Sequence, residues 1–82
     1  MNLTIEFIDG SKESFRFQKR DDADIKSVSR IEKVADTQVL VMALEGERRM
    51  YPLANIKCIR ISPVPAHAPV PDFAIVGATP VG

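Results

Sequence analysis

The sequence predicts an all-β fold: a small, strongly curved antiparallel barrel of five or six strands, followed by a Pro-rich C-terminal tail. Three observations lead to this prediction. Apolar and polar residues alternate through much of the first 62 residues, turn-forming residues recur about every 8 to 12 positions, and the composition changes abruptly at Ser62. The chain has 82 residues, which is room for one core. We therefore expect a small β-barrel domain over 1–62 and a flexible or docked tail over 63–82.

The first predicted feature is an antiparallel hairpin formed by residues 2–8 and 12–18. Three apolar residues alternate with polar ones in the first segment, and two phenylalanines continue the alternation in the second. Residues 9–11 read Asp-Gly-Ser, and Asp and Gly accept the positive φ angles that tight hairpins require. This hairpin is the structural prediction that the sequence supports best.

Residues 19–34 allow two interpretations. Apolar residues recur at intervals of three from Ile25 to Ile31, and an aspartate among residues 21–24 could cap a helical turn. Against this, the segment has several β-branched residues and few strong helix formers. We therefore favour a loop that passes into a strand near 27–34.

The rest of the domain reads as short strands and turns. After a turn at 35–37 we expect a strand over 38–44, a partner strand that begins at 48–51, a tight helical turn at 52–55, and a last strand over 56–61. Proline starts the helical turn because its fixed φ suits the first position of a helix.

This order of elements looks like that of the SH3-like and Sm-like small barrels over about residues 2–61. The resemblance rests on strand order and spacing. The apolar-Arg-Gly step that precedes the last strand in the Sm family is absent, and residues 51–55 read Tyr-Pro-Leu-Ala-Asn there. The clustered aromatics of a peptide-binding SH3 groove are missing too, since the chain has one Tyr and no Trp. The resemblance implies a fold style and assigns no family.

The predicted strand 38–44 is apolar on both faces, although a small sheet usually leaves one face to water. Three covers for the second face are open: the interior of the barrel itself, the apolar tail segment 73–76, or another subunit. A domain of about 60 residues is marginally stable without disulfides, metals or oligomerisation. We expect a homo-oligomer, most simply a dimer. The interface candidates are Val39, Leu40, Val41, Met42, Leu44, Phe73, Ile75 and Val76.

The tail offers a second route to a partner. It holds five of the six prolines and one charge, Asp72. Its Pro-Val-Pro repeats could bind an aromatic groove as a polyproline ligand, and residues 73–76 could add as a strand to the edge of another sheet. Protein–protein interaction, as a binding or scaffolding module, is therefore the function that the sequence favours.

Nucleic-acid binding is the alternative function. A local basic groove with an exposed aromatic can hold single-stranded RNA or DNA by ion pairing and base stacking. Acidic residues are interleaved with the basic ones, however, and the formal net charge is zero. The candidate residues for this function are Arg16, Lys19, Arg20, Arg48, Arg49 and Tyr51.

Several other classes of function lack the residues that they need. The single histidine, His67, lies in the tail, the four glycines form no phosphate-binding loop, and one cysteine, Cys58, makes neither an internal disulfide nor a zinc site. We expect no enzyme activity, cofactor or metal. The longest uncharged stretch of the domain is far shorter than the roughly 18 to 20 apolar residues of a membrane span, and the N-terminus does not resemble a signal peptide. We expect a cytoplasmic protein that does not associate with membranes.

Overall fold

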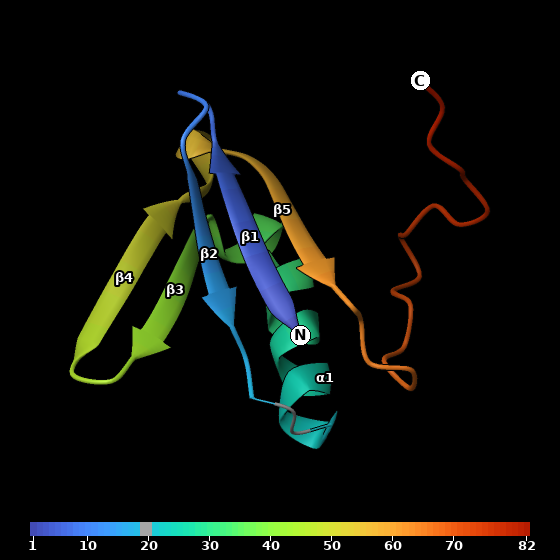
Figure 1. The fold of residues 1–82 in the computed structure, drawn as a ribbon, viewed down its shortest axis with the longest axis horizontal. Coiled ribbons are helices and arrows are strands. Elements are labelled where there is room, and N and C mark those ends of the chain that lie inside the picture. The colour runs from blue at the N-terminus through green and yellow to red at the C-terminus, as the bar shows by residue number, and fades with distance from the viewer. Residues whose placement is uncertain (19–20) are drawn as a thin grey trace.

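Five strands form two antiparallel sheets in the computed structural model, which describes residues 1–18 and 21–82 (Figure 1). The first sheet has the order β2-β1-β5, and the second consists of β3 and β4. In chain order the elements are β1 (Asn2–Phe7), β2 (Lys12–Arg16), α1 (Asp21–Glu32), α2 (Val34–Thr37), β3 (Val39–Leu44), β4 (Glu47–Pro52), the 3-10 turn η1 (Leu53–Asn55) and β5 (Ile56–Ser62).

The predicted N-terminal hairpin is confirmed. β1 pairs with β2 in register from Asn2 with Arg16 to Glu6 with Lys12. Gly10 has a φ of 89° in the turn, and the backbone N–H of Ser11 donates to the Asp9 carboxylate at 2.9 Å. Such short-range hydrogen bonds are the reason that this turn could be predicted from sequence.

The prediction for the second half of the domain is also confirmed. β3 and β4 form a hairpin whose two-residue turn includes Gly46 at a φ of 72°. The short turn η1 follows Pro52, and β5 then pairs with β1 rather than with β4. Leu3 of β1 stands opposite Ile61 of β5, so the two ends of the domain share one sheet.

The preferred interpretation of residues 19–34 is wrong, because Asp21–Glu32 forms helix α1 and not a loop and a strand. The interval of three was the correct signal. On a helix it gathers Ile25, Val28 and Ile31 on one face, and Val28 and Ile31 are buried. Packing of that face outweighs the weak β propensity of the segment. The predicted turn at 35–37 lies in the short helix α2.

The predicted closed barrel is not found among the described residues. A closed barrel needs hydrogen-bonded pairing between the two sheets, but the sheets are separate, and α1 and α2 lie between β2 and β3 along the chain. The fold is therefore mostly strands in two antiparallel sheets, with the helices between β2 and β3 in the sequence.

The core lies where the two sheets and α1 meet. Leu3 and Ile5 of β1 have no exposed surface, and Ile31 of α1 joins Leu40 and Met42 of β3 in the same buried cluster. Three of the four phenylalanines pack against this core: Phe7 of β1, Phe15 of β2 and Phe17 just after β2. The fourth, Phe73, is exposed in the tail.

Residues 63–82 form neither helix nor strand. In Figure 1 this segment descends from the end of β5 and then runs beside the first sheet, on the side away from β3 and β4. Its partly buried residues are Pro65, Ala68, Pro71 and Ala74. The tail thus touches the domain mainly through small residues and prolines, while Phe73, Ile75 and Val76 are exposed.

Candidate interaction surface

β3 has one open edge. The backbone N–H of Leu53 donates to the carbonyl of Gln38 at 3.0 Å, so Gln38 and Leu53 form a hydrogen-bonded pair. Antiparallel pairs alternate between hydrogen-bonded and non-hydrogen-bonded, which makes Val41 and Ala43 non-hydrogen-bonded positions opposite β4. Their N–H and C=O groups therefore point away from β4, toward the open edge.

The residues next to this edge agree with that assignment. Val39, two residues before Val41, is also a non-hydrogen-bonded position opposite β4. Its carbonyl accepts a hydrogen bond from the Thr37 hydroxyl at 2.9 Å. The side chain of Thr37, the last residue of α2, thus satisfies one carbonyl group of the β3 edge. Within residues 1–18 and 21–82, β3 pairs with β4 alone, so the groups at Val41 and Ala43 face the space beside the strand.

The β3 edge carries none of the usual protection against pairing with another chain. Edge strands are commonly protected by charged residues or proline. The other three outer strands follow this rule: β2 contains Lys12 and Arg16, β4 contains two arginines and Pro52, and β5 contains Lys57 and Arg60. Among the strands in the described part of the chain, β3 alone has neither a charge nor a proline.

The outer face of the second sheet exposes an apolar pair, next to Arg48, which stands opposite Ala43. Val41 on β3 stands opposite Met50 on β4, and these side chains are 51% and 68% exposed. Ala43, two residues further along β3, is also exposed. The described residues of one chain therefore leave this face uncovered.

A groove of about 470 Å³ runs between the β3 edge and the helices. Its walls come from three places: β3, the adjoining side of α1 and α2, and Phe17 after β2. The lining residues are Phe17, Ser27, Arg30, Ile31, Val34, Thr37 and 39–43. The groove is mainly apolar, and Arg30 is the one charged residue among the described residues that line it.

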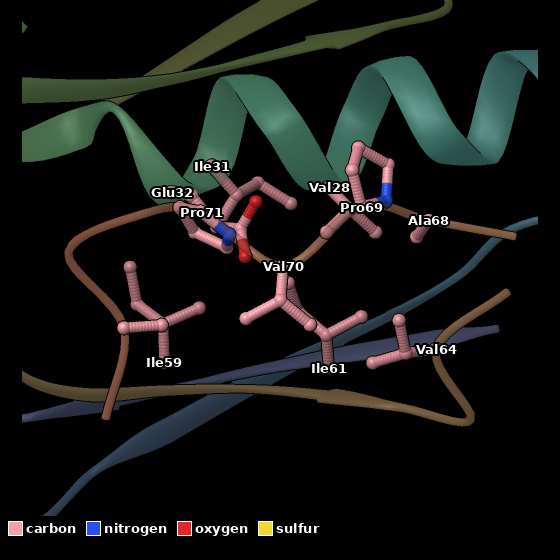
Figure 2. A pocket seen from close by; sticks show the side chains of 11 residues that line it. Val28, Ile31, Glu32, Ile59, Ile61, Val64, Ala68, Pro69, Val70 and Pro71 are labelled. Carbon is pink, nitrogen blue, oxygen red and sulfur yellow. The ribbon is translucent and has the colours of Figure 1, made fainter. Parts of the chain in front are cut away.

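A second groove, of about 450 Å³, lies between α1 and β5 and is bordered by the tail (Figure 2). In Figure 2 the side chain of Val70 points toward Ile61, and Pro69 and Pro71 lie along the helix. Ala74 is the last tail residue in the lining. The tail thus already occupies one side of α1, while the groove on the β3 side of the helix is open.

The predicted interface residues separate into three groups. Leu40 and Met42 belong to the core, and Val39 and Leu44 are half-buried. Val41 is exposed on β3. Phe73, Ile75 and Val76 are exposed in the tail, on the far side of the molecule from β3 (Figure 1). The structure therefore does not bring the strand and tail candidates together within one chain.

The nucleic-acid candidates that lie in the described part of the chain, Arg16, Arg48, Arg49 and Tyr51, do not form one basic surface with an aromatic platform. Tyr51 is half-buried: its ring lies 5.5 Å from that of Phe7, and its hydroxyl donates to the Glu13 carboxylate. Arg49 pairs with Glu47 at 3.2 Å and lies 3.7 Å from Glu13.

Of the other four candidates, two are exposed on different strands and two lie outside the described residues. Arg16 and Arg48 are exposed on β2 and on the outer face of β4. Lys19 and Arg20 lie outside the described residues.

The cluster of Glu13, Arg49 and Tyr51 ties the second sheet to the first. Burial, and then the hydrogen bond with Glu13, raise the pKa of Tyr51 above its ordinary value. Hydrogen bonds with Tyr51 and Glu47 raise the pKa of Arg49. Since a raised pKa keeps both groups protonated at neutral pH, the cluster is a fixed polar contact at the rim of the core rather than a proton-transfer site.

The groove wall is the part of this surface that sequence reasoning missed. Ser27, Arg30 and Val34 were expected on a strand near 27–34, so their common helical side was not recognised. The interval of three between Ile25 and Ile31 is the signal that could have identified it. The exposure of Met50 was missed as well, because the β4 segment shows no regular alternation.

Comparison of the chain with protein-family models, with curated proteins and with solved structures finds no match. In the described residues no group of three or more His, Cys, Asp and Glu side chains is placed to hold a metal ion. No helix in these residues has the length and apolarity needed to cross a bilayer.

Proposed function

We propose that this protein is a homo-oligomeric interaction module that associates through β3, and that it acts by binding rather than by catalysis. The observation that carries the proposal is the combination at β3 of an uncharged open edge and an exposed apolar face. The open edge of β3 can give affinity by added ladder hydrogen bonds, and the exposed face of the second sheet can give it by burial of Val41 on β3 and Met50 on β4.

Size supports the same proposal. A domain of about 60 residues buries only about 60% of the surface that its unfolded chain exposes. Here two of the five strands form a separate sheet with an uncovered outer face. Association would bury the apolar surface that a single chain leaves exposed on this face.

The finer features expected from the sequence belong to this proposal. We propose an SH3-like arrangement of strands, supported by the η1 turn before β5 and by the pairing of β5 with β1. We also propose a cytoplasmic location, on the evidence of the sequence alone. Nucleic-acid binding has less support, because Tyr51 is half-buried and Arg49 is paired with an acid.

The solution mass of the full chain tests the proposed function. We expect light scattering to give at least twice the monomer mass of 9.1 kDa at micromolar concentration. Val41→Lys places a charge on the unprotected strand, and we expect it to shift the chain toward monomer. Ile8→Lys is the matched control, since Ile8 is an exposed apolar residue, 67% accessible, at the tip of the other hairpin.

Each outcome has a clear meaning. A monomeric mass for the unaltered chain over the whole concentration range overturns the proposal. Oligomers that dissociate in both lysine variants would place the interface elsewhere and would also overturn it. Dissociation of the Val41→Lys variant alone supports association through β3.

A further inference from the structure

The C-terminal tail contains one segment that can act as a strand. Prolines stand at 63, 65, 69, 71 and 80, and each removes a backbone donor and resists pairing inside a sheet. Between Pro71 and Pro80 the chain reads Asp-Phe-Ala-Ile-Val-Gly-Ala-Thr without interruption. This strand-forming tail segment, residues 72–79, is the longest proline-free run in the tail.

The segment exposes its apolar side chains to an unusual degree. Phe73, Ile75 and Val76 are 74%, 92% and 73% exposed. Side chains of this size are normally covered, and a cluster of exposed ones marks an interaction site. Nothing in the described part of the chain covers these three.

The segment does not lie near the β3 edge of its own chain. Ala74 lines the groove between α1 and β5, which the tail borders from Val64 onward. In Figure 1 the tail and β3 lie on opposite sides of the first sheet. While the tail keeps this position, a strand added to β3 has to come from another molecule.

The groove beside β3 fits such a strand in three respects. Its edge offers the free N–H and C=O groups of Val41 and Ala43, which match the alternating groups of an incoming strand. Its mainly apolar walls can receive side chains from alternate positions, and Phe73 and Ile75 are two residues apart. The charges are complementary too: Arg30 is the charged residue of the groove, and Asp72 is the charged residue of the tail.

From this match we propose that residues 72–79 of one copy add as a strand to the β3 edge of a second copy. Phe73 and Ile75 enter the groove between β3 and α1, and the second sheet gains a third strand. The inference rests on the proposed function and specifies how it is achieved: the tail is the ligand, and the β3 groove is its site. Reciprocal exchange between two copies gives a closed dimer.

A charge within the tail segment tests the inference in the full chain. We expect Ile75→Asp to raise the dissociation constant of the oligomer by roughly tenfold or more, because an isoleucine side chain loses its apolar cover. Val81→Asp is the matched control: Val81 is 95% exposed in the same tail but lies beyond Pro80. The control should associate like the unaltered chain. Both positions are almost fully exposed, so neither change affects the core.

Hydrogen exchange of single amides gives a second measurement that locates the contact. The N–H groups of Val41 and Ala43 face the open edge in a single chain and should exchange rapidly at low concentration. We expect both to become protected as the unaltered chain and the Val81→Asp variant associate. In the Ile75→Asp variant they should remain unprotected at the same concentration.

The two proposals can fail separately. If the unaltered chain is monomeric at every concentration, the proposed function fails and this inference fails with it. If the chain associates and Val41→Lys dissociates it, but Ile75→Asp does not weaken it, the proposed function holds and the tail is not the ligand. Equal weakening by Ile75→Asp and Val81→Asp, or association without protection of Val41 and Ala43, would also overturn the inference.

Discussion

The outer face of the first sheet carries polar pairs, whereas that of the second carries an exposed apolar pair. On β2-β1-β5, Thr4 and Ser14 are hydrogen-bonded across the strands at 3.2 Å, and Glu6 pairs with Lys57 at 3.5 Å. The outer face of β3 and β4 carries instead a pair of apolar side chains, Val41 opposite Met50. The first sheet therefore has one apolar and one polar face, as expected for a sheet that works alone.

The two sheets also differ in how they end. The first has charged residues on both outer strands, whereas β3 in the second has no charged residue and, within the described residues, no partner strand on the edge away from β4. Cross-strand polar pairs and charged edges let a sheet meet water without joining another sheet. We infer that the first sheet is adapted to a single chain and the second to an assembly, and the following predictions test that contrast.

The largest expected effect is in the core face of the first sheet. Ile5 has no exposed surface, and Ile5→Ala should lower the free energy of unfolding by about 2 to 5 kcal/mol through lost burial and a cavity. Met50→Ala on the second sheet should change it by no more than about 0.5 kcal/mol. Urea unfolding at the lowest usable protein concentration, where association contributes least to stability, measures the free energy of unfolding of both variants. A similar loss in the two variants would contradict the contrast between the sheets.

A smaller effect is expected at the contact that joins the two sheets. Tyr51→Phe keeps the ring beside Phe7 but removes the hydroxyl that donates to Glu13, and it should cost about 1 kcal/mol. Ser14→Ala removes an exposed hydrogen bond within the first sheet and should cost less, within about 0.5 kcal/mol. The same urea measurement compares them. If Ser14→Ala proved the more costly change, the Tyr51 contact would not connect the sheets energetically.

Local signals predicted the strands, whereas for the helix the apolar interval of three was present but was given less weight than the β-branched residues of the segment. The period-two alternation of β1, the Asp-Gly turn and the proline before η1 each act over a few residues, so they can be recognised in the sequence. α1 depends on burial of Val28 and Ile31 against residues from distant strands. The barrel prediction failed because alternation within each strand does not specify which strands pair, and the two sheets are separate in the structure.

The candidate surface shows the same limit. The double apolar character of β3 was visible in the sequence and correctly marked this strand as unusual. Which face would be buried was not visible, because alternation alone does not distinguish Leu40 and Met42 from Val39 and Val41. The groove could not be predicted either, because one of its walls is the helix that was not expected.

A pH titration should sharpen the contrast at the contact between the sheets. The pKa of Tyr51 is raised above its ordinary value of 10.0, first by burial and then by the hydrogen bond with Glu13. A group with a raised folded pKa contributes stability that is fully present below the unfolded pKa, here about 10, and is lost as the pH rises through the folded pKa. We therefore expect the contribution of Tyr51 to the free energy of unfolding to fall only above pH 10.

Tyr51 is the single tyrosine, so ultraviolet absorbance reports its ionisation without interference. Glu13→Gln removes the nearby negative charge and should move the inflection toward its ordinary position. An inflection at or below pH 10 in the unaltered chain would mean that the ring is not held against the first sheet.

The smallest effect is expected at the turn of the first hairpin. The side-chain and backbone hydrogen bonds from Ser11 lower the pKa of Asp9 below 3.8. A lowered folded pKa contributes stability above the unfolded value, and this contribution disappears as the pH falls through the folded pKa, below about 3.8. Ser11→Ala removes the hydroxyl donor and keeps the backbone donor, so the pKa should rise part of the way.

Carbon-detected nuclear magnetic resonance of the Asp9 carboxyl measures this shift residue by residue. An Asp9 titration that does not move would show that the Ser11 hydroxyl does not hold the Asp9 carboxylate, and that the backbone N–H of Ser11 is the donor that matters in this turn.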